Sequence, residues 1–252
     1  MKLTFLGTGT STGVPQLRCS CPTCTSPDPR DKRLRCSALI ETDRRRSLLI
    51  DCGPDFREQM LRTGSPDIDA VLLTHIHYDH VGGIDDLRPW CRHGHDLDIY
   101  CTEDVERDLR SRLPYCFARH PYPGVPSFRM CRIDRDRPFF AAGEEVVPLP
   151  VMHYRLPIIG FRIGRLAYIT DAKEVPESTV RLLEGVDTLV VNALRPQEHM
   201  SHMSLGQAVA LAQRVGAGRT FFTHMSHDMP PHAGVILPEG ISLAYDGLQI
   251  EL

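Results

Sequence analysis

The chain has 252 residues, of which 42% are hydrophobic and 24% are charged, and its formal net charge is −3. This length and apolar content suffice for a sizeable buried core, so we expect residues 1–252 to form a single domain. The near-neutral charge balance gives no electrostatic reason to expect binding to nucleic acid or to an anionic membrane. No apolar stretch has the length of a membrane span and the N-terminal residues do not resemble a signal peptide, so we expect a cytoplasmic protein.

Strand-like and helix-like segments alternate along the chain. Residues 1–7 follow a strand pattern, and residues 8–35, rich in Thr, Ser, Pro and Arg, are expected to form a long surface loop. Strands are predicted at residues 37–42, 47–50, 70–74, 97–101, 145–151, 158–163, 166–170, 188–192, 220–223 and 248–252. Helices are predicted at residues 54–62, 103–113, 176–183 and 204–215, the last beginning with a capping box of Ser204 and Gln207. This alternation favours a layered α/β architecture in which helices cover sheets.

The end of the predicted strand at residues 70–74 carries an unusual group of polar side chains. Four potential metal ligands occur there within six residues: His75, His77, Asp79 and His80. A buried strand does not need such residues. Histidines at alternate positions can point in one direction while the two residues that follow turn into another, so this one loop could serve two metal ions.

Three further candidates follow other predicted strands, namely His153, Asp171 and His224. A single polar residue at a strand end is usually only a satisfied polar group, but several strand ends can converge on one rim of a sheet. Two metal ions at such a rim would lower the pKa of a shared water so that hydroxide forms near neutral pH, and they would clamp the attacked group. We therefore expect a hydrolase.

The order of these residues resembles the ligand motifs of the metallo-β-lactamase superfamily over most of the chain. The resemblance implies an αββα sandwich with two catalytic divalent metals, for which we expect manganese or zinc. It assigns His75, His77 and His153 to one metal, Asp79, His80 and His224 to the other, and Asp171 to a bridge between them. It also implies that Asp79 is catalytic. Asp51 matches an aspartate that supports the histidine loop in this superfamily, and a purely structural aspartate at a hairpin end is the alternative.

Within the superfamily, the chain most closely resembles the PhnP family of carbon-phosphorus lyase accessory phosphodiesterases, in the branch of the tRNA 3′-processing endonucleases. The glycine-rich residues 7–15 precede a Cys-x-Cys-x-x-Cys cluster, and a histidine lies three positions beyond His224. In that family these residues hold a structural zinc, which implies a third metal site. Its ligands would be Cys19, Cys21, Cys24 and His227, with Cys36 as a rival fourth ligand.

The same resemblance assigns His202 as a catalytic histidine that is not a metal ligand, and His199 is the alternative. A histidine in this place could protonate the departing alkoxide or stabilise the charged phosphoryl group. The resemblance therefore implies a metal-dependent phosphodiesterase that acts on small cyclic or nucleotide phosphodiesters.

Three other functions stay open. The tRNA 3′-processing endonucleases share these motifs but usually carry an RNA-binding arm between the third histidine and the bridging aspartate. His153 and Asp171 are only 18 positions apart, which leaves no room for an arm, so we expect no stable complex with nucleic acid. Lactone or thioester hydrolysis would use the same two-metal centre. A regulatory protein on an inactivated hydrolase scaffold would be expected to lack Asp79 or Asp171, and both are present, so this function is disfavoured.

The resemblance to this family also makes a homodimer an expected possibility.

Overall fold

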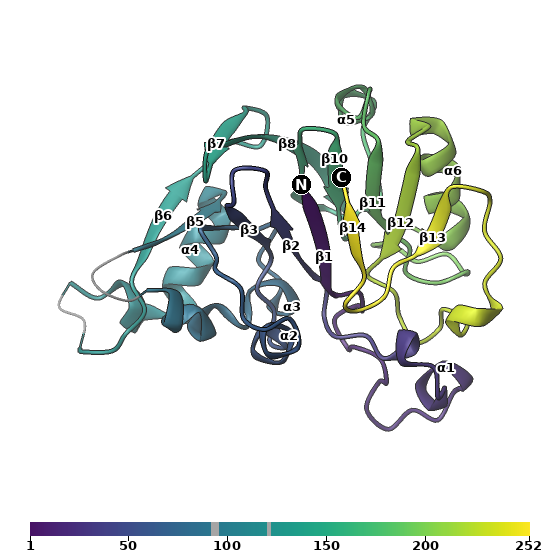
Figure 1. The fold of residues 1–252 in the computed structure, drawn as a ribbon, viewed down its shortest axis with the longest axis horizontal. Coiled ribbons are helices and arrows are strands. Elements are labelled where there is room, and N and C mark those ends of the chain that lie inside the picture. Colours follow the sequence, from purple (N-terminus) through teal and green to yellow (C-terminus); the bar gives the residue numbers. More distant parts are fainter. Residues whose placement is uncertain (92–95, 120–121) are drawn as a thin grey trace.

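Two seven-stranded sheets form the centre of the molecule in the part of the chain that the structure describes (Figure 1). The structure is a computed structural model that describes residues 1–91, 96–119 and 122–252. In spatial order, the first sheet contains β14 (Gln249–Glu251), β1 (Lys2–Gly7), β2 (Ser37–Glu41), β3 (Ser47–Ile50), β4 (Ala70–Leu72), β5 (Leu97–Cys101) and β6 (Phe128–Arg132). The second contains β13 (Ile241–Leu243), β12 (Arg219–Thr223), β11 (Thr188–Asn192), β10 (Leu166–Ile169), β9 (Leu156–Ile163), β8 (Glu144–His153) and β7 (Phe139–Ala141).

Each sheet is antiparallel on one side and parallel on the other. Strands β3 to β6 run parallel to one another, and so do strands β10 to β13. Parallel strands require crossover connections, and helices provide most of these. The helices are α1 (Pro22–Thr25), α2 (Phe56–Arg62), α3 (Tyr78–Val81), α4 (Glu103–Arg112), α5 (Glu177–Leu182) and α6 (Leu205–Val215), with 3₁₀ turns η1 (Pro29–Asp31), η2 (Ile84–Trp90), η3 (Pro114–Phe117) and η4 (His232–Gly234). Because parallel strands end at a common edge, the loops that follow them lie close together.

The side chains of the central strands alternate between two hydrophobic layers. In β3, Leu48 faces the core between the two sheets, whereas Leu49 faces the core that α2 and α4 cover. In β10, Tyr168 faces the same inter-sheet core, whereas Ile169 faces the core beneath α6. Figure 1 shows the helices on the two outer sides of the pair of sheets. This confirms the four-layer αββα sandwich that the sequence predicts.

The strands that the sequence missed are β6, β7 and β13, and each of them lies at the edge of a sheet. An edge strand is covered less completely than a central one, so its hydrophobic pattern is weaker. In contrast, the predicted strands at 47–50, 97–101 and 188–192 have the predicted boundaries. The Ser204 and Gln207 capping box is also confirmed, since both of its hydrogen bonds are formed.

The prediction that residues 8–35 form a surface loop is wrong in part. This segment contains α1 and η1, and it buries an ion pair in which Arg33 Nη2 lies 3.0 Å from an oxygen of Asp31. The hydroxyl of Ser26 and the backbone N–H of His232 also donate to the Asp31 carboxylate. A polar segment can therefore be buried when its charged groups find partners, which composition alone does not reveal.

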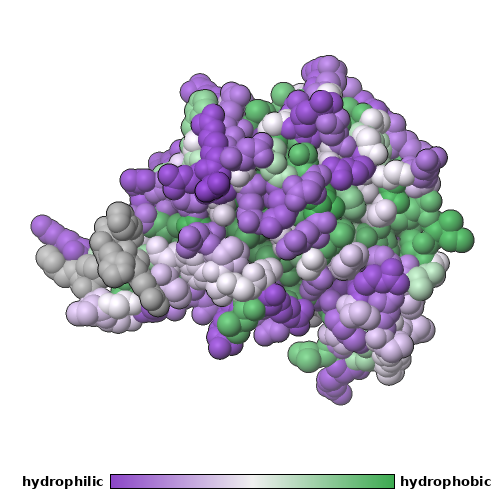
Figure 2. All heavy atoms as spheres, in the orientation of Figure 1, coloured by the Kyte–Doolittle hydropathy of each residue, from purple (hydrophilic) through white to green (hydrophobic). Residues whose placement is uncertain are grey.

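The outer surface is mostly polar on the face that Figure 2 shows. A hydrophobic patch occurs at the right edge of that view, where Figure 1 places the segment before β13, and Ile236 in this segment is 96% exposed. None of the helices within the described ranges is long and apolar enough to span a membrane.

Gly53 provides a test of how the loop after β3 packs. A methyl group at this position would lie 2.1 Å from the carbonyl oxygen of Asp79, so Gly53→Ala would push apart two tightly packed loops. We expect the free energy of unfolding to fall by about 1–3 kcal/mol in urea denaturation. Gly206→Ala is the matched control, because the space around Gly206 in α6 is open and alanine favours a helix. Parent-like stability of Gly53→Ala would contradict this packing.

Candidate metal centre

Loops that follow several strands bring the predicted ligands together. Asp51 follows β3, His75 follows β4, Asp171 follows β10, and His224 follows β12. His153 is the last residue of β8, and α3 carries Asp79 and His80. The rings of His75 and His77 have centroids 4.6 Å apart, those of His77 and His153 are 5.0 Å apart, and those of His80 and His224 are 5.6 Å apart. The structure therefore gathers all seven predicted catalytic ligands at one place.

The backbone at this place is strained. Asp51, Asp171 and His224 adopt positive φ angles of 58°, 57° and 55°. Such a conformation in a residue other than glycine costs about 1–3 kcal/mol, and it persists only where the surrounding structure holds it in place. These three residues follow β3, β10 and β12, at the positions where the chain leaves each strand and places a side chain in the centre.

Asp171 belongs to two groups of side chains that could each hold a metal ion. The first group is Asp79, His80, Asp171 and His224, and the second is His153, Asp171 and His202; in each group the ligand atoms lie within 4.8 Å of one another. His80 Nε2 lies 3.2 Å from Asp171 Oδ2, and His224 Nε2 lies 3.2 Å from Asp171 Oδ1. Ligands that share one ion at bond lengths of about 2.1 Å are separated by roughly 3 Å, so these distances suit a metal ion.

The hydrogen bonds of three histidines leave one ring nitrogen free to face an ion. His153 Nδ1 lies 2.9 Å from two backbone carbonyl oxygens, so it carries the proton. His80 Nδ1 lies 2.7 Å from Asp51 Oδ2, and His75 Nδ1 lies 3.0 Å from the Thr74 hydroxyl, which itself donates to Asp51. The Nε2 atoms of His75 and His80 are buried without a hydrogen-bond partner. A divalent cation would satisfy these atoms, and the residues present therefore fit a metal centre.

The electrostatics of the site balance buried carboxylates against histidines. Burial tends to raise the pKa of Asp171, but His224 and His80 outweigh burial and hold this pKa well below its usual range. Burial tends to lower the pKa of His80, but the carboxylates of Asp171, Asp79 and Asp51 raise it well above the usual value. Burial lowers the pKa of His202 to about 3. This lowered pKa favours the neutral imidazole form of His202 at neutral pH.

His202 lies closer to the centre than His199 does. Its ring centroid is 4.6 Å from that of His153 and 5.0 Å from that of His224, whereas the ring of His199 is next to His202, at 5.3 Å. His202 Nδ1 is 3.7 Å from Asp171 Oδ1. This position allows His202 to reach a group bound at the centre.

Sequence reasoning missed the threonines that precede three of the candidate ligands. Thr74, Thr170 and Thr223 come directly before His75, Asp171 and His224, and all three hydroxyls are buried in hydrogen bonds. The sequence signal that could have identified these threonines is the repeated pair of a threonine and a candidate ligand after three strands.

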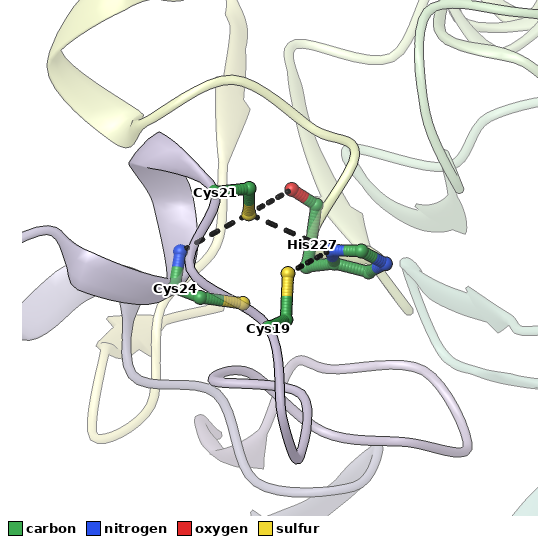
Figure 3. Close-up of side chains that lie close together, drawn as sticks. All are labelled: Cys19, Cys21, Cys24 and His227. Atoms are coloured by element: carbon green, nitrogen blue, oxygen red, sulfur yellow. Dashed lines mark hydrogen bonds between the residues drawn. The ribbon is translucent and has the colours of Figure 1, made fainter.

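A second cluster, formed by Cys19, Cys21, Cys24 and His227, lies where the segment around α1 meets the loop after β12 (Figure 3). Its four ligand atoms lie within 4.8 Å of one another, and a tetrahedral zinc with Zn–S bonds of about 2.3 Å would separate its sulfurs by roughly 3.8 Å. Cys19 Sγ and Cys21 Sγ lie 3.2 and 3.5 Å from His227 Nδ1. Burial would raise the pKa of Cys21, but hydrogen bonds from the Cys24 backbone and His227 lower it to about 6. The lowered pKa favours the thiolate form of Cys21, which is the form that binds a metal ion.

The alternative fourth ligand, Cys36, is wrong. Its sulfur is completely buried and lies 3.1 Å from the Tyr168 hydroxyl and 3.3 Å from the Thr223 hydroxyl, within the core between the sheets. Cys36 lies at the start of β2, and the packing of the sandwich directs its side chain inward, away from the other three cysteines.

Comparisons with known proteins identify the family of the chain. A family profile described as the beta-lactamase superfamily domain matches residues 46–225. The crystal structure of a new diphosphatase from the PhnP family is 40% identical, with a TM-score of 0.91 and coverage of 100% of this chain and 97% of that one. Coenzyme PQQ synthesis protein B of Methylobacterium nodulans is 36% identical over 91% of both chains. A protein named octanoyltransferase from Porphyromonas gingivalis is 45% identical over 99% of this chain, which spans only 51% of that relative's length.

Asp171→Asn tests the shared carboxylate. Replacing one carboxylate oxygen by an amide nitrogen removes negative charge and one ligand atom, so we expect manganese affinity to fall at least tenfold and one ion per chain to be lost in calorimetric titration. Asp187→Asn, at an exposed pair with Arg165, should bind like the parent. Two ions bound by Asp171→Asn with parent affinity would contradict a shared ligand.

Cys21→Ser tests the second cluster. We expect the purified variant to contain one zinc ion fewer per chain than the parent, as measured by inductively coupled plasma mass spectrometry, and to melt at a lower temperature because zinc binding stabilises the folded state. Cys131→Ser, a half-buried cysteine in β6, should keep the parent's zinc content. An unchanged zinc content in Cys21→Ser would show that these thiols hold no metal.

Proposed function

Because the chain belongs to the beta-lactamase superfamily, we propose that it is a dinuclear metal-dependent phosphodiesterase that hydrolyses small cyclic or nucleotide phosphodiesters. The observation that carries this proposal is the position of the Asp171 carboxylate, which lies within 4.8 Å of ligand atoms of Asp79, His80 and His224 and also of His153, a candidate ligand of the other ion. A carboxylate in this position can join two ions into one centre.

The proposed ligands are those that the sequence motifs indicate. His75, His77 and His153 hold one ion, Asp79, His80 and His224 hold the other, and Asp171 bridges them. The Cys19, Cys21, Cys24 and His227 cluster holds a structural zinc. When bound, two divalent ions supply a water-derived nucleophile at neutral pH and neutralise charge on the attacked group.

The surrounding residues orient this centre and handle the leaving group. Asp51 accepts hydrogen bonds from His80 and Thr74, which fixes the histidine loop before any ligand binds. His77 is half-buried, whereas the other candidate ligands are buried, so substrate approaches on the side of His77. His202 is buried next to Asp171 and presents a neutral imidazole, which donates a hydrogen bond to the phosphoryl group or to the departing oxygen.

Two observations favour a small phosphorylated substrate. The similarity to a PhnP-family diphosphatase points to chemistry at a phosphoryl group, since diphosphates and phosphodiesters both present charged phosphoryl oxygens. The interval between His153 and Asp171 is occupied by β9 and β10 of the second sheet, which supports the absence of an RNA-binding arm at this place. A tRNA-processing nuclease is therefore disfavoured.

The second candidate function is hydrolysis of an acyl substrate, because a relative that is 45% identical to this chain is named octanoyltransferase. The chain matches only about half of that relative, so the name does not identify the activity of the matching half. The same two-metal centre can serve lactones and thioesters, so an octanoyl thioester belongs among the tested substrates.

The test is hydrolysis of a 2′,3′-cyclic nucleotide by manganese-loaded protein, beside a simple lactone and an octanoyl thioester. We expect turnover of the cyclic nucleotide, and a fall in kcat of about 10²–10⁴-fold in His202→Ala with unchanged metal content. His232→Ala removes a half-buried histidine beside Tyr245 and should behave like the parent.

The other outcomes are equally informative. Turnover of the lactone or thioester alone would replace the phosphodiesterase with an acyl hydrolase. Loss of a metal ion in His202→Ala would make His202 a ligand, and loss of activity in His199→Ala with an active His202→Ala would transfer the catalytic role to His199.

A further inference from the structure

A buried hydrogen-bonded group lies directly behind the candidate metal centre. The hydroxyls of Tyr168 and Thr223 lie 3.1 and 3.3 Å from the sulfur of Cys36, and the Thr170 hydroxyl lies 3.7 Å from it. All four side chains are completely buried. Thr170 and Thr223 each precede a candidate ligand, so a single thiol contacts the residues that deliver Asp171 and His224 to the centre.

The number of available protons sets the direction of these hydrogen bonds. The Thr170 hydroxyl donates to Asp171 Oδ2 over 2.7 Å, and a bond to a carboxylate is stronger than one to sulfur. A hydroxyl has only one hydrogen, so Thr170 cannot also donate to Cys36. Burial raises the pKa of the Cys36 thiol to about 11, so this thiol keeps its proton and can donate it to Thr170. The sulfur in turn accepts from Tyr168 or Thr223.

We propose that Cys36 is a positioning residue for the metal centre: its thiol holds the Thr170 hydroxyl in the orientation that fixes the Asp171 carboxylate. With this carboxylate fixed, Oδ2 faces His80 and Oδ1 faces His224, each at 3.2 Å. The role rests on the metal centre proposed above, but not on its substrate. Cys36 touches no candidate ligand atom itself and acts through Thr170 and Thr223.

The size of sulfur suits this position. Three hydroxyl oxygens lie between 3.1 and 3.7 Å from the sulfur, which is the range of contacts that a thiol makes and longer than most hydroxyl-hydroxyl bonds. Serine at this position would keep a donor and an acceptor but would reach its partners less well. Alanine would leave the fully buried Tyr168 hydroxyl without the partner that the structure gives it.

The experiment measures manganese binding by Cys36→Ala, Cys36→Ser and Tyr168→Phe, using electron paramagnetic resonance of free manganese and calorimetry, together with thermal unfolding of the metal-free chains. Cys101→Ala is the matched control. Cys101 in β5 is also a completely buried cysteine, and the described part of the chain gives its thiol no hydrogen bond. Both alanine variants should lose thermal stability from the cavity that they create.

Of the two alanine variants, we expect Cys36→Ala to bind manganese about 10–100-fold more weakly than the parent and Cys101→Ala to bind it like the parent. A loss of this size is usual when a group that orients a ligand is removed. Cys36→Ser should recover part of this affinity, because its hydroxyl keeps a donor and an acceptor but reaches its partners less well. Tyr168→Phe should show a smaller loss than Cys36→Ala because the Cys36 to Thr170 link remains. Parent-like manganese affinity in Cys36→Ala would overturn the proposal. If neither Cys36 variant folds, Thr170→Val decides, because it removes the hydroxyl through which Cys36 is proposed to act, and parent affinity in that variant overturns the proposal.

The experiment distinguishes failure of the proposed substrate class from failure of the proposed role of Cys36. A parent chain that binds two manganese ions without cleaving a phosphodiester would overturn the proposed substrate class and leave the role of Cys36 standing. A parent chain that binds no pair of ions would overturn the metal centre and the role of Cys36 together.

Discussion

Buried negative charge is the constraint on which the rest of this structure depends. The carboxylates of Asp51, Asp79 and Asp171 lie within a single buried cluster, and an unpaired buried carboxylate is too costly for a folded protein to keep. His80 contacts all three of them, which is why its pKa rises far above that of an exposed histidine. A proton on His80 would offset part of this charge. Divalent ions at the proposed sites would offset it more completely, so the buried carboxylates favour metal binding.

The two candidate metal sites are joined by one short segment. His224 belongs to the catalytic cluster and His227 to the cysteine cluster, and Met225 between them forms backbone hydrogen bonds with Thr8 and Thr10. The glycine-rich N-terminal residues are thus paired with the ligand-bearing loop itself. A zinc ion at the cysteine cluster would hold the N-terminal segment against this loop, which explains why a cysteine motif so early in the chain lies next to a histidine so close to its end.

Family membership and substrate are decided by different parts of the molecule. The family is shown by the profile match over residues 46–225, and the fold is shared with a PhnP-family diphosphatase at a TM-score of 0.91. Under the proposed function, the substrate would be selected by groups that meet its leaving group, and His202 lies in a position to do so, beside Asp171 and His153.

Several of the candidate metal ligands could be predicted from the sequence because they follow hydrophobic runs that predict strands. The run at β4 is followed by His75, that at β10 by Asp171, and that at β12 by His224. Because β4 lies in the first sheet and β10 and β12 lie in the second, only the packing of the two sheets brings these strand ends together. The edge strands and the buried ion pair of Arg33 and Asp31 could not be predicted from the sequence, because their burial depends on which segments pack over them. Cys36 shows the limit most clearly. Its partners Tyr168 and Thr223 lie 132 and 187 positions away, and only the packing of the two sheets against each other brings them to its sulfur.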